Sequence, residues 1–433
     1  MDSTSIFLWL LGAFGFLLAI GAPVFAALGV SSILGMYFIG GSSSLMTIPS
    51  ILYRGMTSYS LIAIPLFILM GEVIARTNLG GRLFTLFYLW LHRLPGSLAM
   101  ASVGSSAVFG AMSGVSVAGA ATIGRFAIPE MIKRNYSPSL AGGSVAAAGA
   151  LALLIPPSIG FILYGEIANQ SIGRLFIAAI IPGIMVAILM VIYIGLLAII
   201  HPASAPRIKV QVTWTQRFKA LKDIWAAMVL VLLVLGSIYL GVATPTEAAG
   251  LGAIGAFAIA ALYRQLELPT FFDIIRSTAV TSGMILLILA AALLFGWVIT
   301  RLMIPQELVM WISGMDVPAW TIFLMILLFL LVIGMFLDIV SIILIATPIV
   351  LPVIEQLGFS PIWFGVVMII TCEMAVITPP IGLNLYVIKG VAPNISLADI
   401  INGALPFVLV EAFAILLLIL FPSIALWLPN FMW

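Results

Sequence analysis

Two adjacent prolines occur twice in this chain, each time inside a long apolar stretch. Pro156-Pro157 returns 223 residues later as Pro379-Pro380. A proline inside a helix removes a backbone hydrogen bond and clashes with the preceding turn, so two in a row should unwind the helix. In lipid, freed backbone groups are tolerated only where protein buries them or where they line a polar cavity. The repeated pair therefore predicts two broken helices at membrane depth, a sign of a transport site.

The composition indicates that these stretches lie in a membrane. Of 433 residues, 64% are hydrophobic and 7% are charged, whereas a soluble domain carries about 25% charged residues. Many apolar runs reach the ~20 residues that a helix needs to cross a bilayer, which is too long for barrel strands. We therefore expect an all-α polytopic membrane protein embedded in the lipid bilayer.

Several classes of function lack their sequence signals. There is no glycine-rich phosphate loop with its lysine, so we expect no bound nucleotide. No basic patch with interleaved aromatic residues indicates a nucleic-acid partner. The one cysteine, Cys372, and two histidines, His92 and His201, do not make a metal cluster. No nucleophile and base converge, so the sequence predicts a protein that is not an enzyme.

The apolar runs form two sets of seven that copy each other. The first set lies in residues 1–200 and the second in 224–433, with a polar linker at 201–223 between them. Matching positions recur in order at offsets of 222 to 225 residues: Pro129 with Pro352, Ser137-Pro138 with Ser360-Pro361, Tyr164 with Tyr386, and the segment 71–76 with 296–301. Chance alignment of apolar sequence is the alternative, but it does not explain prolines that recur at the same internal spacings.

Positive charge indicates how the chain is oriented, because cytoplasmic loops carry an excess of lysine and arginine. The linker holds five such residues and should be cytoplasmic: Arg207, Lys209, Arg217, Lys219 and Lys222. Basic residues flank both ends of the run 97–133, which suits a re-entrant hairpin entering from the cytoplasm. An odd number of crossings in each half inverts the second, whose hairpin 319–357 should enter from the other side, with a periplasmic N-terminus. Full crossings in place of hairpins are the alternative.

The middle of the first hairpin is a candidate cation site. Ser113, Gly114 and Ser116 put two hydroxyls and free carbonyls at a helix break. Pro156 and Ser158, in the broken helix 138–169, should face them. Hydroxyl and carbonyl oxygens suit a hard cation such as Na⁺, because they can replace its hydration shell. The alternative is that these small residues only let helices pack closely.

The second hairpin has an equivalent tip that carries an acid. Gly334 and Asp338 lie there, opposite Thr378, Pro379 and Asn384 of the broken helix 361–391. A charge at membrane depth costs ~3 kcal/mol or more and usually faces a partner or a water-filled cavity. The pattern predicts a second cation site with a carboxylate ligand. Capping of the return helix by Asp338 is the alternative, and both can hold together.

Arg125 is the lone cation inside the return arm of the first hairpin. An arginine matches a carboxylate in bidentate geometry, so Arg125 could bind an anionic substrate, with Ser116 and Asp338 at the two tips. It could equally pair with a buried acid such as Glu373. Three other acids in or beside apolar runs are expected to be interhelical partners or ion relays: Glu72, Glu166 and Glu411. Glu247 follows Thr244-Pro245, so we expect it to cap a helix.

Six short motifs carry a resemblance to a known family: Gly110-Ala-Met-Ser-Gly-Val-Ser-Val-Ala-Gly, Ile128-Pro-Glu-Met, Leu154-Ile-Pro-Pro-Ser, Gln170-Ser-Ile-Gly-Arg-Leu-Phe, Gly334-Met-Phe-Leu-Asp and Thr378-Pro-Pro-Ile-Gly-Leu-Asn-Leu. With them, essentially the whole chain resembles the large membrane subunit, the M or DctM type, of tripartite ATP-independent periplasmic (TRAP) transporters. No single motif is specific, but together they are.

The resemblance implies a fold of the ion-transporter superfamily and an elevator mechanism, in which a domain with both hairpins and both broken helices slides across a scaffold. It implies Na⁺-coupled import of an organic acid, such as a C4-dicarboxylate or sialic acid, across the bacterial inner membrane, with two or more Na⁺ ions bound at the two tips. A periplasmic solute-binding protein delivers the substrate, and a small four-helix membrane subunit enlarges the scaffold. No four-helix extension precedes Met1, so we expect that subunit to be a separate chain.

Two alternatives stay open at this point. The chain could be a stand-alone anion transporter of the same superfamily, coupled to Na⁺ or to protons through its buried glutamates. A remote alternative is an intramembrane enzyme, which would need a reactive pair of side chains at membrane depth.

Overall fold

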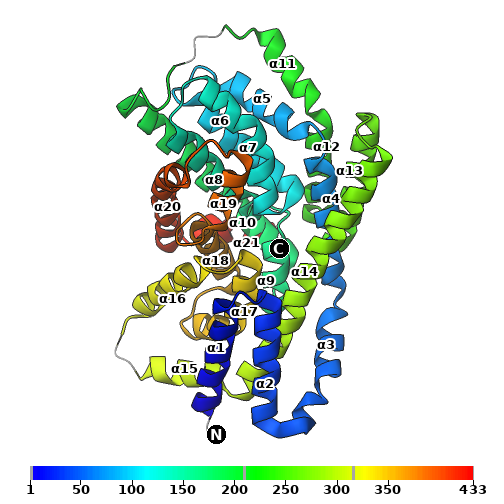
Figure 1. Ribbon diagram of the computed structural model, residues 1–433, viewed down its shortest axis with the longest axis vertical. Coiled ribbons are helices and arrows are strands. Elements are labelled where there is room, and N and C mark those ends of the chain that lie inside the picture. Colours follow the sequence, from blue (N-terminus) through cyan, green and yellow to red (C-terminus); the bar gives the residue numbers. More distant parts are fainter. Residues whose placement is uncertain (1–2, 208–210, 315–316, 433) are drawn as a thin grey trace.

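The computed structural model describes residues 3–207, 211–314 and 317–432, and every regular element in them is a helix (Figure 1). The helices of the first half are α1 Ser3–Ala19, α2 Val24–Leu45, α3 Ile48–Met56, η1 Tyr59–Ile62, α4 Ala63–Ala75, α5 Leu79–Leu91, α6 Ser97–Ser113, α7 Ser116–Lys133, α8 Pro138–Leu154, α9 Ile159–Ile167 and α10 Ile172–Ile200.

The helices that follow are α11 Trp214–Asp223, α12 Trp225–Tyr239, α13 Pro245–Leu262, α14 Leu268–Arg301, α15 Ile304–Ser313, α16 Ala319–Gly334, α17 Ile339–Gln356, α18 Pro361–Val376, α19 Leu383–Val391, α20 Leu397–Leu420 and α21 Ser423–Met432. In the described ranges, six helices are long and apolar enough to cross a bilayer, or nine if three bent pairs count as single spans. The prediction of an all-α polytopic membrane protein is confirmed.

The order of helices from α4 to α10 repeats from α14 to α20. Each half contains a hairpin, α6–α7 or α16–α17, and then a helix interrupted at the double proline, α8–α9 or α18–α19. In Figure 1, α5 and α6 lie toward the upper end, whereas their counterparts α15 and α16 lie toward the lower end. The halves therefore run in opposite directions, and the predicted fold of two inverted repeats with hairpins and broken helices is confirmed.

The repeated Ser-Pro pairs begin the two broken helices. The Ser137 hydroxyl accepts a hydrogen bond from the Leu140 N–H, and Ser360 does the same for Trp363. A serine cap satisfies one of the free N–H groups at a helix start, and proline fits the first helical position because its missing N–H is not needed there. The same local chemistry therefore sets the start of both helices.

Helices α8 and α18 form the centre of the molecule, because every residue from Leu140 to Leu154 and from Ile362 to Val376 is buried. Small residues allow the close packing around α8. Gly143 lies against the backbone of Gly403 in α20, and a Cβ on Gly149 would lie 2.5 Å from the Cβ of Ala120 in α7. Backbones that approach this closely are typical of helix packing in membranes. The hairpins, α8–α10 and α18–α20 make up what we call the core.

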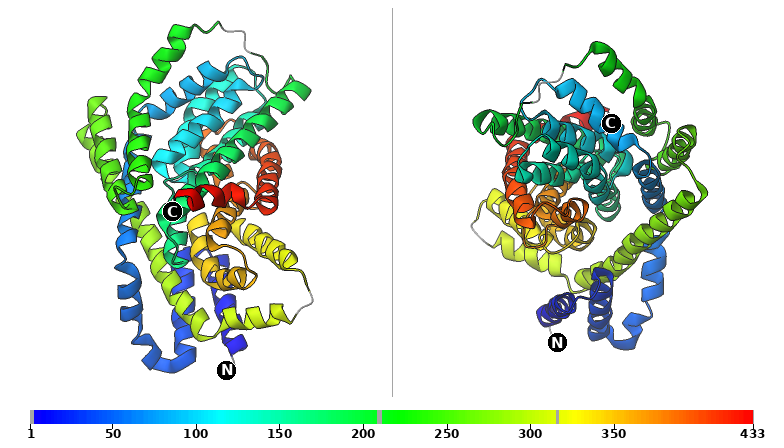
Figure 2. Two further views of the ribbon diagram at one scale, coloured as in Figure 1. Left: turned by 180° about the vertical axis from the view of Figure 1, so that it is seen from behind. Right: turned by 45° about the horizontal axis from the view of Figure 1, so that its top comes forward.

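A second group of helices packs alongside the core and is called the frame: α2, α3, α4, α13 and α14. Its longest member, α14, runs diagonally past the core in Figure 1 and in both views of Figure 2. The frame touches the core chiefly where α4 meets α6 and where α14 meets α17.

Three segments differ from the apolar runs of the sequence. The linker 201–223 contains α11, whose start is a capping box between Thr213 and Gln216, while Lys209 lies outside the described residues. The last run, 398–429, is two helices that part at Pro422, because proline cannot continue α20. Helix α3 carries no long apolar run and was not expected.

Candidate ion and substrate site

The tip of the first hairpin touches the first broken helix backbone to backbone. Gly114 has a φ of +62°, and its N–H donates to the Gly110 carbonyl at 2.8 Å. A Cβ on Gly114 would lie 2.9 Å from the carbonyl oxygen of Pro157. Both the left-handed backbone and the close approach require glycine at this position.

Two serine hydroxyls flank this contact. Ser113 is 1% exposed and Ser158 is 0% exposed, and neither hydroxyl has a hydrogen-bond partner among the described residues. Burying a hydroxyl without a partner costs free energy, so such groups in a folded protein need an explanation. Together with the Pro157 carbonyl, which closely approaches Gly114, they offer oxygen ligands of the kind that hold a hard cation.

The tip of the second hairpin carries a carboxylate that already has partners. Asp338 caps α17: its carboxylate accepts from the Ser341 N–H at 3.1 Å and also from the Ser341 hydroxyl. The capping alternative is therefore confirmed. Asp338 is only half-buried, so its remaining oxygen lone pairs are free to bind a cation or a substrate group.

The second tip also contacts its own broken helix. The Ile381 N–H donates to the Met335 carbonyl at 3.3 Å, and Gly334 packs directly against Ala375 of α18. The Thr378 hydroxyl donates within its helix to the Met374 carbonyl at 2.6 Å. This hairpin is therefore joined to its break as the first hairpin is, although the contacting groups differ.

The two breaks differ in burial. Pro156 and Pro157 are both buried, whereas Pro379 is half-buried and Pro380 is exposed. The first break is thus closed off from solvent in this structure, while the second is open.

Asn384 contacts the first hairpin. Its amide donates to the Ser116 hydroxyl at 2.9 Å and to the Ala146 carbonyl at 3.2 Å, and it is 1% exposed. Its helix, α19, packs on α7 and α8. The place of Asn384 beside Asp338 in a second cation site stays a prediction.

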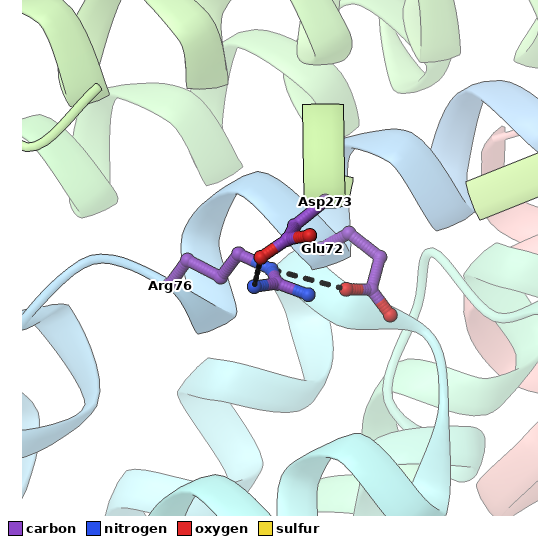
Figure 3. A network of polar contacts seen from close by, with 3 residues as sticks. All are labelled: Glu72, Arg76 and Asp273. Atoms are coloured by element: carbon purple, nitrogen blue, oxygen red, sulfur yellow. Dashed lines mark ion pairs between the residues drawn. The ribbon is translucent and has the colours of Figure 1, made fainter. Parts of the chain in front are cut away.

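Arg125 lines a cavity of about 810 Å³ between the return arm of the first hairpin and the frame. Three arginines border it, Arg76, Arg125 and Arg264, together with Glu72 and other residues. Arg76 is already paired in the frame, at 3.8 Å from Glu72 and 3.6 Å from Asp273 (Figure 3). Arg125 is exposed and forms no ion pair with the described residues, so it is available to an anion in the cavity.

The alternative pairing of Arg125 with Glu373 is not formed in this structure. Glu373 is completely buried in α18, as is Glu411 in α20, and none of their four carboxyl oxygens has a hydrogen-bond partner among the described residues. Arg125 lies nine residues after Ser116 in the same helix, which is about 14 Å along the axis. It therefore lies away from the tips, toward the C-terminal end of α7.

The chain matches the family model described as "Tripartite ATP-independent periplasmic transporter, DctM component" over residues 11–424. It belongs to the DctM family.

Two relatives illustrate the family. The C4-dicarboxylate TRAP transporter large permease protein DctM of Pseudomonas aeruginosa is 33% identical over 383 residues, 88% of each chain. The isethionate TRAP transporter permease protein DctMQ of Oleidesulfovibrio alaskensis is 33% identical over 97% of this chain and 66% of its own length. Among solved structures, the Alcanivorax borkumensis YdaH transporter has the same fold, with a TM-score of 0.61 over 90% of each chain at 15% identity.

As a DctM-family protein, the chain is the large membrane permease of a secondary transporter and not an enzyme. DctM-family permeases import a solute together with a small membrane subunit and a periplasmic binding protein. The identification made from the six sequence motifs is therefore confirmed.

Several residues of the candidate site and of the cavity were not found from the sequence. Ser341, which holds Asp338, follows it by three residues, and this serine-after-aspartate spacing at a helix start could have been noticed. Arg264, Gln265 and Glu267 of the cavity lie in a polar break between two apolar runs. Gly71, whose Cβ would lie 2.9 Å from Ser113, had been noted only as part of the repeat.

Proposed function

We propose that this permease couples the import of a small organic anion to Na⁺, with one cation site at each hairpin tip. The observation that carries the proposal is the pair of buried hydroxyls, Ser113 and Ser158, beside the Pro157 carbonyl. Hydroxyl and carbonyl oxygens without partners suit Na⁺, which prefers oxygen ligands. At the second tip, Asp338 supplies a carboxylate, with Gly334, Thr378 and Pro379 around it.

The substrate should be a carboxylate or a similar anion, such as a C4-dicarboxylate or sialic acid. Arg125, exposed in the cavity, attracts such an anion. The names of both relatives, a C4-dicarboxylate and an isethionate transporter, agree with an anionic solute. Ser116 and Asp338, at the tips, should contact the solute before it reaches Arg125, which lies on the cytoplasmic side of the tips in the proposed orientation.

The direction of transport follows from the proposed orientation. Helix α11, with Arg217, Lys219 and Lys222, lies at the end of the molecule opposite the N-terminus (Figure 1). Basic residues favour the cytoplasmic side, so the N-terminus should face the periplasm of a bacterial inner-membrane protein. The solute then arrives from a periplasmic binding protein, and the small four-helix subunit should pack on the frame.

Movement of the core against the frame should carry the solute across, as in an elevator. The cavity at Arg125 lies between the two parts, and the first break is buried while the second is open. An asymmetric arrangement of two similar halves is what one end state of such a movement requires.

A proton is a second candidate for the coupling ion, favoured by Glu373 and Glu411. An ionised carboxylate that is fully buried and unpaired is very costly. The pair therefore needs a proton or a cation to neutralise it, and its protonation could change during transport.

The test is uptake of labelled succinate, sialic acid and isethionate into vesicles that contain the permease, its small subunit and its binding protein. Na⁺-coupled import should stop when the vesicles hold the same Na⁺ concentration inside as outside. It should persist when a pH gradient of either sign is imposed on vesicles that keep the same inward Na⁺ gradient. Uptake that does not need the Na⁺ gradient and follows the pH gradient would assign the coupling to protons at Glu373 and Glu411.

A further inference from the structure

The tip of the first hairpin rests on a glycine of the frame. A Cβ on Gly71, in α4, would lie 2.9 Å from both the Cα and the carbonyl oxygen of Ser113. Real Cβ atoms essentially never approach backbone this closely, so no other residue fits there without moving the tip. Gly71 is buried, and α4 packs on α6, the arm that ends at Ser113.

The equivalent glycine of the second half has no hairpin tip packed against it. Gly296, in α14, matches Gly71 in the aligned segments 71–76 and 296–301. No atom of the described residues lies within 4 Å of a Cβ placed on Gly296. The frame helix α14 packs on α17, and not chiefly on α16, so the second tip is not seated on it as the first tip is seated on α4.

The tip residue that should pack against Gly296 is exposed. Ser113 corresponds to Phe336, 223 residues later, at the tip of the second hairpin. Phe336 is 57% exposed, whereas Ser113 is 1% exposed. In the first half, the frame glycine Gly71 contacts the tip residue Ser113. At the equivalent positions of the second half, Gly296 has open space beside it and Phe336 is exposed.

We propose that Gly71 and Gly296 are alternate seats for the two hairpin tips and so position the core in its two end states. In the state described here, the first tip occupies Gly71 and Gly296 is empty. In the opposite state the first tip leaves Gly71, and the backbone and ring of Phe336 cover Gly296. The inference rests on the proposed elevator movement and adds the residues at which each end state stops.

A cysteine pair tests the second contact directly. The natural Cys372 is 0% exposed, so engineered thiols can be followed without interference from it. Gly296→Cys with Phe336→Cys should form a disulfide under copper-phenanthroline in vesicles, because the opposite state brings these positions within the ~7 Å between Cα atoms that a disulfide needs. Gly283→Cys with Phe336→Cys is the matched control: Gly283 is also on α14 with nothing within 4 Å, and it should not cross-link.

Substitutions at the seats should shift this cross-link in opposite directions. Adding Gly71→Ala to the cysteine pair crowds the present state and should raise the cross-linking rate severalfold. Gly296→Leu, in the protein with its natural cysteine, fits the present state but blocks the other. It should therefore reduce solute uptake at least tenfold, while Gly283→Leu leaves uptake near the original rate.

The outcomes separate this inference from the proposed function. Suppose that the unmodified complex imports solute, but the 296/336 pair never cross-links or Gly296→Leu transports at the original rate. The proposed role of Gly71 and Gly296 is then wrong, and the proposed transport function is unaffected. If the unmodified complex imports nothing in a Na⁺ gradient, the proposed coupling fails first. Size-exclusion profiles of the Gly296→Leu and Gly283→Leu proteins establish that both fold, and Gly296→Ala provides a milder variant for the same measurement.

Discussion

Each double-proline break faces a hairpin tip, but the polar groups at the two breaks differ. At the first break, both prolines are buried, and two serine hydroxyls have no hydrogen-bond partner in the part of the chain that the structure describes. Beside the second, one proline is exposed, and the tip carries a carboxylate already held by Ser341. The two breaks share their adjacent prolines, but the tips differ in backbone as well as in polar ligands, because Gly114 ends α6 with a φ of +62° whereas Met335 follows α16 with a φ of −64°.

The energetic consequence is that the two sites should bind a cation with different strength. A carboxylate adds a full charge to the ligand set, and hydrogen bonds to charged groups contribute about 1.5–3 kcal/mol against about 1 kcal/mol for neutral ones. A carboxylate at membrane depth is tolerable where it is half-buried and hydrogen-bonded, as Asp338 is. We therefore expect the second site to depend on fixed charge and the first on neutral oxygens.

The largest effect should follow from Asp338→Asn, which removes the charge and keeps the cap, because asparagine caps helices as well as aspartate does. Losing a charged ligand worth about 2 kcal/mol should weaken Na⁺ binding at the second site more than tenfold. Na⁺-driven uptake in vesicles should fall to near background, while thermal stability in detergent stays close to that of the original protein.

The control is Ser360→Ala, which removes a comparable cap from α18 and no proposed ligand. It should cost about 1 kcal/mol of stability and leave the Na⁺ dependence of uptake unchanged. If Asp338→Asn behaves in the same way, the second half has no charged site and the difference between the halves disappears.

The sequence could predict features that depend on neighbouring residues, but not features that depend on how distant segments pack. Pro156-Pro157 and Pro379-Pro380 break helices through their own backbone chemistry, so both breaks and the inverted repeat were predictable. The cap at Asp338 is also local, spanning three residues. The partner of Asn384 was not predictable, because Ser116 is 268 residues away in the chain and the bond depends on how α19 packs. The cavity at Arg125 likewise exists only where frame and core meet.

Asn384→Leu should have the next largest effect, because Asn384 is the residue that joins the halves at the sites. Its loss leaves the Ala146 carbonyl and the Ser116 hydroxyl without that donor in a buried place, which costs about 1–3 kcal/mol. Uptake should fall about tenfold for a cost near 1.4 kcal/mol. Together, Asn384→Leu and Ser116→Ala should be less harmful than their separate effects predict, with about 1 kcal/mol of coupling. Additive effects would show that the two residues act independently.

Ser113→Ala and Ser158→Ala should each raise the Na⁺ concentration for half-maximal uptake about fivefold, since one neutral ligand contributes about 1 kcal/mol. Neither change should destabilise the fold, because neither hydroxyl has a partner among the described residues. Ser106→Ala is the matched control: Ser106 is also buried in α6, and its hydroxyl likewise has no partner among the described residues, yet it lies two turns before the tip. An equal shift in the control would mean that the first break holds no cation.

Arg125→Ala should have the smallest effect, because Arg125 lies about 14 Å along the helix from the tip and contributes mainly through long-range attraction. Such attraction is screened over about 10 Å at 0.1 M salt, so uptake at low substrate should fall roughly threefold at low ionic strength and less when choline chloride is added at fixed Na⁺. Arg125→Lys should retain most of the rate. Arg276→Ala, an exposed arginine outside the cavity, should change nothing. A salt-independent loss for Arg125→Ala would instead mean that Arg125 holds the substrate directly, and would bring the two tips and the cavity into one binding site.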